Sequence, residues 1–316
     1  MADQKIIAVM GARGAQGGGL VRAILADQGG PFKARAITRD IRSDRAKELR
    51  ALGAEVVAAD VDDEESLKRA FAGAYGAFCV TFFWAHMSPE RETAEAQAMA
   101  RVAKGAGVQH AIWSTLEDTR RWVPLSDNRM PTLKGQYKVP HFDAKGAADK
   151  LFTEAGVPTT FLATCAYWDN LIHFGWGPKK GPDGKLAITF PLGTSSLAGI
   201  AAEDIGKCAY GIFKQGAQWI GKTVGIAGEH LTGAQMAASL TKALGQSVSY
   251  HDIPPEVYRG FGFPGADDLG NMFQFDRDFA ADLRRLHPVE VSRQLNPALQ
   301  TFDQWLAANV EHIPLG

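Results

Sequence analysis

Cysteine is scarce in this 316-residue chain, and long apolar runs are missing. The three cysteines, Cys79, Cys165 and Cys208, stand far apart and form no CxxC pair, which excludes a disulfide framework and is typical of reduced thiols. No stretch reaches the roughly 20 apolar residues of a membrane-spanning helix. The apolar run before the first glycines is too short for a secretory signal peptide. The sequence therefore predicts a cytoplasmic protein without a membrane contact.

An excess of either charge is also lacking. The 34 Lys and Arg residues balance 35 Asp and Glu residues, and no long basic cluster or helix-turn-helix pattern occurs, so we expect no direct binding of nucleic acid. The eight histidines form no HExxH motif and no clustered Cys/His spacing, so we expect no metal. GxSxG and Walker A motifs are missing as well. These absences leave an ordinary globular composition, with 46% hydrophobic residues.

Short β-rich runs alternate with helical stretches from residue 5 onward. Because this rhythm is typical of consecutive βαβ units, it predicts an α/β fold with a Rossmann-type, doubly wound parallel sheet. The helical stretches carry start signals at Ser43 and Asp62 and stop signals at Gly53 and Gly73. The six expected strands are 5–10, 32–38, 54–60, 75–81, 109–115 and 158–164.

The alternation changes after Asn170. A stretch rich in Pro, Gly and Lys at 175–185 indicates exposed turns, while 222–232 again has strand character and precedes a helical stretch. We therefore predict a main domain over 1–170, rejoined by about 222–245. A smaller, discontinuous C-terminal α/β domain over 171–221 and 246–316 is expected to hold the substrate or a partner.

A glycine-rich loop, GARGAQG, follows the first expected strand and opens the first helix. Gly11, Gly14 and Gly17 let a diphosphate approach the backbone, and free N–H groups at the helix start favour an anion. The spacing is GxxGxxG rather than GxGxxG. This context predicts a nicotinamide dinucleotide at the loop; a tight turn without a ligand is the plain structural alternative.

The second expected strand ends at Thr38-Arg39-Asp40, beside the expected position of the adenosine ribose. An arginine there accommodates the 2′-phosphate of NADP, whereas an acidic residue hydrogen-bonds the free hydroxyl of NAD. Arg39 therefore favours NADP(H), and Arg13 in the glycine loop is placed to close on the same phosphate. If Asp40 faces the ribose, the preference weakens or reverses. Asp60, which ends the third strand, either contacts the adenosine or caps the next helix.

A possible catalytic set follows the fifth strand. Ser114 lies near the end of that strand, and His141 and Lys145 share one face of a helix that Pro140 begins. In short-chain dehydrogenases a YxxxK pair holds this place, and here histidine replaces the tyrosine. Because histidine can donate a proton near neutral pH, chemistry is still possible. Lys145 either binds only the nicotinamide ribose or also acts in catalysis, and Pro140 holds Tyr137 off the helix.

Six aromatic residues near these strand ends are candidates for an apolar pocket around a nicotinamide ring, although most aromatic residues belong to cores. They are Trp84, Trp122, Tyr167, Trp168, Phe174 and Trp176. The segment 116–140 is too long for a simple connection between a strand and a helix. It is either a lid or a mobile surface loop.

With these features in place, the chain resembles the NmrA-like family of atypical short-chain dehydrogenases, in particular its NADPH-sensing members. The likeness runs nearly end to end, through GARGAQGG, TRDIRSDRAKELRALGAEVVAAD, HFDAKG, AYWDNL, GFPGADDLGNMF (262–273) and LNPALQTFDQWL (295–306). The last two segments have no general fold reason to recur, so they carry most of the resemblance.

The resemblance implies a set of NADP(H) contacts. These are Gly11, Arg13, Gly14, Ala15, Gln16, Gly17, Arg39, Arg42, Ser43, Asp60, Val61, Thr81, Phe82, Phe83, Lys145, Tyr167, Trp168, Asp169 and Asn170. A further family lysine is replaced by Ala94. The related isoflavone and phenylcoumaran reductases carry a catalytic lysine, and Lys145 matches its spacing to the strand at GVPTT (156–160).

Two functions stay open at this point. In the first, which we favour, the protein is an NADP(H) redox sensor with little or no catalysis, whose cofactor occupancy biases a protein partner. In the second, it is an NADPH-dependent reductase of a small hydrophobic quinone, carbonyl or imine, such as a small aromatic substrate. The missing tyrosine favours the sensor, whereas Ser114, His141, Lys145 and the aromatic residues favour the reductase. The sequence leaves open whether the protein is a monomer or a homodimer.

Overall fold

The central sheet consists of seven strands: β1 (Lys5–Val9), β2 (Phe32–Thr38), β3 (Glu55–Ala58), β4 (Gly76–Cys79), β5 (His110–Thr115), β6 (Thr159–Ala163) and β11 (Thr223–Gly225). The computed structural model describes residues 4–181 and 183–316. The strand order is β11-β6-β5-β4-β1-β2-β3, with parallel pairing throughout. The chain runs outward from β1 to β3 and then outward from β4 on the other side. This order confirms the predicted doubly wound, Rossmann-type sheet and its six expected strands.

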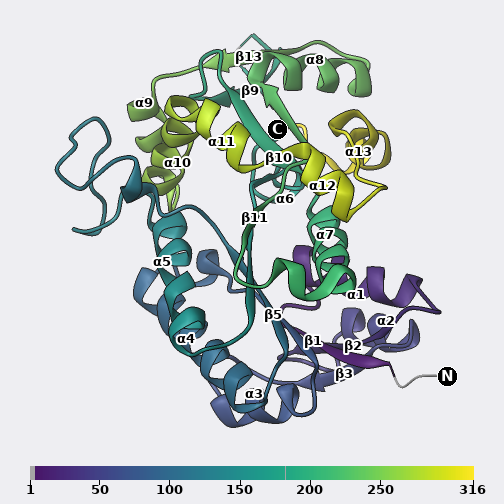
Figure 1. Cartoon of the computed structure of the whole chain (residues 1–316). Helices are drawn as coiled ribbons and strands as arrows, with labels where there is room; N and C mark the ends of the chain where they lie inside the picture. Colours follow the sequence, from purple (N-terminus) through teal and green to yellow (C-terminus); the bar gives the residue numbers. More distant parts are fainter. Residues whose placement is uncertain (1–3, 182) are drawn as a thin grey trace.

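Helices cover both faces of the sheet because successive residues of a strand point to opposite sides. Ile7 and Val9 belong to the core beneath two helices, α1 (Ala15–Ala26) and α7 (Ala202–Gln215), whereas Ala8 belongs to the opposite core. That second core packs beneath α3 (Glu64–Phe71), α4 (Pro89–Gly105) and α5 (Pro140–Glu154). In Figure 1, α4 and α5 lie to the left of the strands and α1 and α7 to the right.

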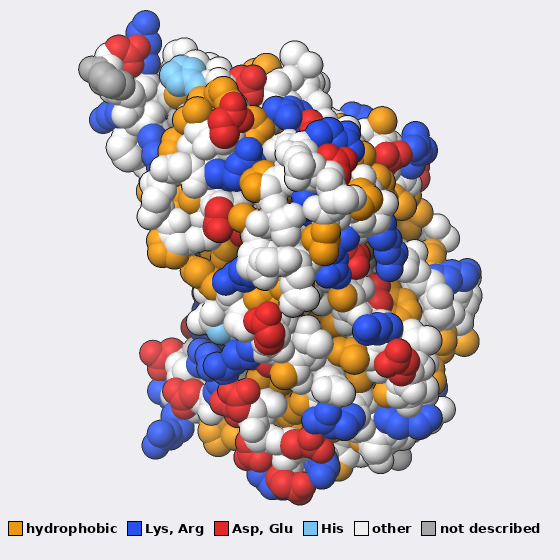
Figure 2. Space-filling view, turned by 90° about the vertical axis from the view of Figure 1, so that its left-hand side faces the viewer, with side chains coloured by type: hydrophobic (Ala, Val, Ile, Leu, Met, Phe, Trp, Pro, Cys, Tyr) orange, Lys and Arg blue, Asp and Glu red, His pale blue; other side chains and the backbone are white. Residues whose placement is uncertain are grey.

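A second layer with its own core lies beyond the carboxyl ends of these strands, in the upper part of Figure 1. Its two sheets have the orders β12-β10-β7 and β13-β9-β8. The strands are β7 (Ala166–Tyr167), β8 (Lys179–Lys180), β9 (Leu186–Phe190), β10 (Ser196–Ile200), β12 (Glu229–Thr232) and β13 (Val248–Asp252). The helices are α6 (Asn170–His173), α8 (Gly233–Leu244), α9 (Pro255–Arg259), α10 (Ala266–Asp278), α11 (Ala280–Leu286), α12 (Val289–Leu295) and α13 (Phe302–Asn309). Figure 2 shows an indentation between the two parts, bordered above by hydrophobic side chains.

Two helices lie elsewhere than the predicted domain boundaries would place them. Strand β11 does return to the central sheet, beside β6. Helix α8 does not follow it, because Met236, Ala237 and Leu240 are buried in the core of the second layer. Helix α7, which falls within the range predicted for the smaller domain, instead packs on the central sheet. Strand character is visible in the sequence, whereas the layer that a helix joins depends on distant partners.

The predicted cap of the third helix was wrong by one residue. Ser43 caps α2 (Asp44–Ala51) as expected, and its hydroxyl accepts the N–H of Ala46. For α3 the cap is Asp63, whose side chain accepts the N–H of Ser66, and not Asp62. Neighbouring aspartates satisfy the same spacing rule, so the sequence does not distinguish them.

The stretch 175–185 is only partly the exposed turn that was predicted; Pro182 lies outside the described residues. Trp176 is buried and packs against Phe190 and Phe273, and Lys179–Lys180 pair with β9. No helix of the described ranges is long and apolar enough to cross a membrane. The short 3-10 helices are η1 (Phe83–Ala85), η2 (Thr119–Arg121), η3 (Gly216–Trp219) and η4 (Val310–His312).

Helices α1 and α7 touch through their backbones. A Cβ atom added at Gly206 would lie 2.1 Å from the backbone nitrogen of Leu20, and one added at Gly19 would lie 2.6 Å from the carbonyl oxygen of Glu203. Such distances leave no room for a side chain, and backbone on both sides cannot rotate away. This contact fixes the helix that follows the glycine loop.

We expect Gly206→Ala to lower the free energy of unfolding by about 1–3 kcal/mol, because the added methyl group overpacks the contact. Gly105→Ala is the control, since Gly105 also lies in a helix but has no atom within 4 Å of an added Cβ. That change should be neutral or stabilise by roughly 0.5–1 kcal/mol. Urea unfolding of the two variants measures both effects. Equal stabilities would contradict the close helix contact.

Candidate functional site

The glycine loop between β1 and α1 has the geometry of an anion site. Gly11 has a φ of 61°, and its carbonyl oxygen accepts the N–H of Gly14 at 2.7 Å. A Cβ at Gly17 would lie 2.6 Å from the carbonyl oxygens of Gly11 and Met10, so only glycine fits there. No side chain caps the start of α1. The N–H groups of its first turn, beginning at Ala15, are therefore available to a ligand.

Arginines gather beside this loop. Arg13 and Arg39 are exposed, and their side chains form no hydrogen bond or ion pair with any residue that the structure describes. Arg45, which the sequence interpretation missed, donates from Nη1 to the carbonyl oxygen of Arg13 at 2.8 Å. Arg42 is almost fully exposed. The side chains on this edge are therefore predominantly cationic.

Asp40 is the residue whose charge would weaken a preference for NADP. In the structure it forms hydrogen bonds within the turn 40–43. Its Oδ1 accepts the backbone N–H of Arg42 at 2.9 Å, and its carbonyl oxygen accepts the Ser43 hydroxyl at 3.0 Å. This turn orders the entry to α2. Asp60, at the end of β3, likewise accepts the N–H of Asp62 at 3.1 Å and does not cap α3.

Ser114 and Tyr167 are linked through Gln16. The Ser114 hydroxyl donates to Gln16 Oε1 at 2.8 Å, and Gln16 Nε2 donates to the Tyr167 hydroxyl at 2.5 Å. Burial raises the pKa of Tyr167 to about 12, so the phenol stays protonated. Of the predicted catalytic set, Ser114 is therefore engaged with the first helix rather than with His141 or Lys145.

Lys145 belongs to α5, and its ammonium group lies at the carboxyl end of β4. Its Nζ is 2.7 Å from Glu92 Oε1 and 2.5 Å from the hydroxyl oxygen of Thr81, which also hydrogen-bonds Glu92. Glu92 is fully buried. Sequence reasoning placed Lys145 and Thr81 near the cofactor but missed Glu92, because no local motif marks a carboxylate that reaches across from α4.

His141 is held by a second missed carboxylate. Its Nδ1 lies 2.6 Å from Asp268 Oδ1, and its backbone N–H donates to Asp268 Oδ2 at 3.2 Å. The carboxylate fixes the proton on Nδ1 and leaves Nε2 for another partner. The rings of Trp84 and Phe83 lie 4.8 and 5.9 Å from the imidazole centroid. Asp268 belongs to the segment 262–273, which was used for the resemblance to the NmrA-like family. The sequence alone indicated no chemical role for this aspartate.

The remaining predicted contacts differ in accessibility. Phe82 is exposed and Phe83 buried, while Val61 follows Asp60 at the sheet edge. Asp169 accepts the N–H of Ala202 at 2.8 Å and so supports the start of α7, and Asn170 begins α6. Trp168 is buried against Phe302 and Trp305.

The six aromatic residues do not form one pocket. Trp168 and Trp176 belong to the buried core of the second layer, and Trp122 packs against it. Trp84 lies beside His141 instead, and Phe174 is exposed. Packing of the second layer therefore accounts for half of the set.

The segment 116–140 is fastened at several points. Asp143 accepts the N–H of Thr119 at 2.8 Å and that of Lys138 at 2.7 Å. The buried Lys138 ammonium donates to the carbonyl oxygens of Asp127 and Met130, and Asn271 on α10 donates to that of Pro131 at 2.9 Å. These bonds hold the segment against α5 and α10, an arrangement that favours neither a lid nor a mobile loop.

A family model, the NmrA-like family, matches residues 3–306. The chain belongs to the NmrA-like family. Among its relatives, the NmrA-like oxidoreductase lnbB of Aspergillus flavus is 31% identical, with 87% of this chain and 84% of that protein covered. The oxidoreductase notA of an Aspergillus species is 32% identical, with 86% and 83% covered.

Solved structures with the same fold include NmrA, a negative transcriptional regulator, in complex with NADP. Its TM-score is 0.79 at 23% identity, with 98% of this chain and 97% of that chain covered. Citrobacter triphenylmethane reductase, complexed with NADP(H), has a TM-score of 0.72 at 17% identity, with 97% and 99% covered. At these identities the similarity shows the fold.

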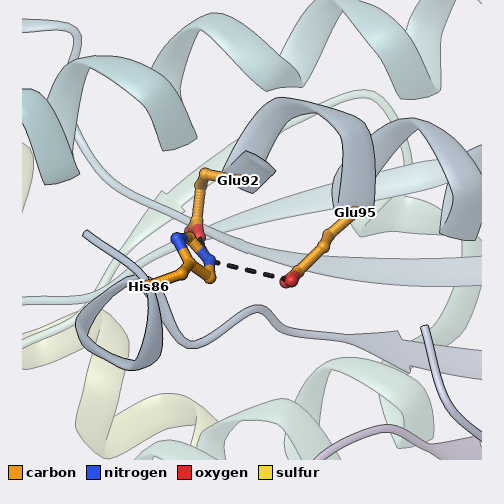
Figure 3. Close-up of side chains that lie close together, drawn as sticks. All are labelled: His86, Glu92 and Glu95. Atoms are coloured by element: carbon orange, nitrogen blue, oxygen red, sulfur yellow. Dashed lines mark ion pairs between the residues drawn. The ribbon is translucent and has the colours of Figure 1, made fainter. Parts of the chain in front are cut away.

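In this NmrA-like protein, His86, Glu92 and Glu95 form a cluster that the sequence analysis did not find (Figure 3). Their ligand atoms lie within 4.8 Å of one another, close enough for a cation. The His86 ring argues against a metal: its Nδ1 accepts the N–H of Ser88 at 3.0 Å, so the proton of the neutral ring is on Nε2, which faces both carboxylates. Burial lowers the pKa of His86 and keeps the ring neutral. We interpret the cluster as a close electrostatic contact between one N–H group and two carboxylates, at 3.5 and 3.7 Å.

A second buried ionisable group lies where β5 and β11 meet α10 and α11. His287 Nε2 lies 2.8 Å from Glu117 Oε1, and Nδ1 lies 3.2 Å from the carbonyl oxygen of Ile226. Burial alone lowers the pKa of His287, but Glu117 and Ile226 raise it by more. Nearby, burial and the charge of Glu117 raise the pKa of Asp276 to about 8, against an opposing effect of His287. Asp276 is therefore mainly protonated at neutral pH.

The raised pKa of Asp276 contributes a loss of stability as pH rises. The folded pKa of about 8 exceeds the ordinary 3.8, so the folded state keeps a proton that the unfolded state releases. The cost is absent below about pH 4, grows up to about pH 8 and is complete above it. We expect Asp276→Asn, which stays neutral, to melt several degrees above wild type at about pH 8 and at a similar temperature at about pH 4.

Thermal unfolding followed by circular dichroism at both pH values measures this difference. Asp278→Asn, on the same helix but paired with Arg277 at the surface, is the control and should change little at either pH. A gain for Asp276→Asn that is equal at both pH values would rule out ionisation as its cause.

Proposed function

We propose that this protein binds NADP(H) at the start of α1. The main observation behind this proposal is that no side chain caps the start of α1. Arg13 and Arg39 lie beside it, and both are exposed and have no acidic partner among the described residues. The helix start offers N–H donors to a diphosphate, and Arg39 follows β2, where a 2′-phosphate would lie. Asp40 closes its own turn, which favours NADP(H) over NAD(H).

The solved relatives support the proposal. NmrA has been crystallised with NADP and also with NAD, and triphenylmethane reductase with NADP(H). In open α/β sheets such cofactors bind at the carboxyl ends of the strands, and the glycine loop of this chain follows the carboxyl end of β1. Because NmrA accepts both cofactors, the choice between them in this chain depends on its own arginines.

We further propose that the protein is an NADPH-dependent reductase of a small hydrophobic carbonyl, quinone or imine. The His141–Asp268 pair supports this, since Asp268 orients the ring, and a ring that carries a proton on each nitrogen can donate the Nε2 proton beside Trp84. Bound NADPH supplies a hydride. His141 supplies the proton that completes the reduction and regains one from solvent, and Lys145 binds the nicotinamide ribose. Relatives above 30% identity that carry the name oxidoreductase agree with this choice.

A redox sensor is the second candidate. It is favoured by Ser114, whose hydroxyl donates to Gln16 instead of standing ready for a substrate, and by the missing tyrosine. In this case NADP(H) occupancy biases binding of a protein partner, and turnover is small or absent.

The cofactor proposal predicts that Arg39→Ala weakens NADPH binding by about tenfold or more, because a charge-assisted bond to phosphate contributes roughly 1.5–3 kcal/mol. NADH binding should be unchanged. Arg50→Ala, an exposed arginine at the far end of α2, is the control and should affect neither cofactor. Isothermal titration with both cofactors measures these affinities. Wild-type protein that binds NADPH and NADH equally would refute recognition of the 2′-phosphate.

The reductase proposal predicts that Asp268→Asn lowers the rate of NADPH oxidation by about 10- to 100-fold while NADPH binding persists, because the imidazole loses the carboxylate that orients it. The exposed neighbour Asp267→Asn serves as control. The assay follows NADPH absorbance with a panel of quinones, aldehydes and imines. NADPH binding without turnover of any panel member in wild type would favour the sensor.

A further inference from the structure

Glu92 is a buried carboxylate whose two oxygens face different residues. Oε1 faces Lys145 Nζ at 2.7 Å and the Thr81 hydroxyl, whereas Oε2 faces His86 Nε2 at 3.5 Å (Figure 3). The side chain of Glu92 has no exposed surface, and that of Lys145 is 11% exposed. Four parts of the chain therefore meet at one carboxylate: α4, α5, the end of β4 and the end of η1.

The nitrogen of His86 that carries the proton decides what the ring presents to this carboxylate. Because Nδ1 accepts the Ser88 N–H, the ring presents an N–H group to Glu92 and Glu95. Oε1 of the carboxylate thus faces an ammonium group at 2.7 Å, and Oε2 faces an N–H group at 3.5 Å that is too far away for a formed hydrogen bond. Glu92 also lies in the first turn of α4, where the helix dipole favours a negative charge.

A buried ion pair is weak evidence for fold stability, since apolar residues of similar volume often replace such pairs without loss. The pair does fix a position: Lys145 is one turn along α5 from His141, and its Nζ is held at Thr81, on the edge where the nicotinamide half of the cofactor would lie. Glu92 itself is too deeply buried to contact a ligand.

We propose that Glu92 is the positioning residue of Lys145: it keeps the ammonium charged and directed at the carboxyl end of β4, where Lys145 binds the nicotinamide ribose. The proposal rests on the proposed cofactor site. Glu92 acts through Lys145 alone and touches neither cofactor nor substrate.

Glu95 provides a matched control. It shares α4 and the His86 N–H with Glu92, and its side chain is 10% exposed, but its cationic partner is Arg91 at 3.1 Å rather than Lys145. Burial raises the pKa of Glu95. A substitution at Glu95 thus disturbs the same cluster without removing the carboxylate from Lys145.

The first experiment needs no cofactor. Lys145 is labelled with an amine-reactive reagent at about pH 8 and quantified by peptide mass spectrometry, with the exposed Lys150 on the same helix as internal reference. Glu92→Gln should raise the labelling rate of Lys145 relative to Lys150 several-fold, because a buried ammonium without its anion releases its proton more readily. Glu95→Gln should leave the ratio unchanged. An unchanged ratio in Glu92→Gln, or an equal rise in both variants, overturns the proposal.

The second experiment measures NADPH affinity against pH. Glu92→Gln should bind NADPH more weakly, with a loss that grows between about pH 7 and pH 10, whereas a purely structural defect gives a loss independent of pH. If labelling changes as expected and wild type binds no NADPH, the proposed cofactor site fails and the Glu92–Lys145 coupling stands.

A double variant keeps the test decisive if Glu92→Gln does not fold. Lys145→Met and the combination Glu92→Gln with Lys145→Met remove one charge or both. If Glu92 acts through Lys145, the two proteins bind NADPH with equal affinity. An additional loss in the double variant overturns the proposal, because it shows an effect of Glu92 that does not pass through the lysine.

Discussion

Parallel pairing of the seven central strands is the constraint on which the site depends. Because all strands run in one direction, the residues that follow β1, β2, β4 and β5 meet at a single edge. The glycine loop, Arg39, Thr81 and Ser114 come together there although about a hundred residues separate the first from the last. The backbone contact of α1 with α7 then holds the first helix start against this edge.

The polar side chains at this edge form three separate pairs. Ser114 bonds to Gln16, Lys145 to Glu92 and His141 to Asp268. In each pair a residue that the sequence singled out meets a partner from another element. Buried polar groups require such partners. The chemistry of each group is therefore set by a side chain that lies far away in the sequence.

Local patterns explain which parts of this structure the sequence predicts. Alternation and turn residues give the six strands, and the spacing of Gly11, Gly14 and Gly17 gives the loop, because both depend on neighbours in the chain. Asp268 and Glu92 were missed, since their partners lie 127 and 53 residues away and no motif connects them. The positions of α8, Trp168 and Trp176 in the second layer were missed for the same reason, because tertiary packing determines which layer they join. Asp63 replaced Asp62 as a cap because adjacent aspartates fit one rule equally well.

Helix α10 connects parts of the molecule that the sequence keeps apart. Asp268, in its first turn, holds His141, and Asn271, almost one turn later, holds the carbonyl oxygens of Pro131 and Lys138. The imidazole and the surface loop thus share a common support. Loops of different length between 124 and 136 can therefore be accommodated during evolution while the imidazole keeps its orientation, provided that α10 stays in place.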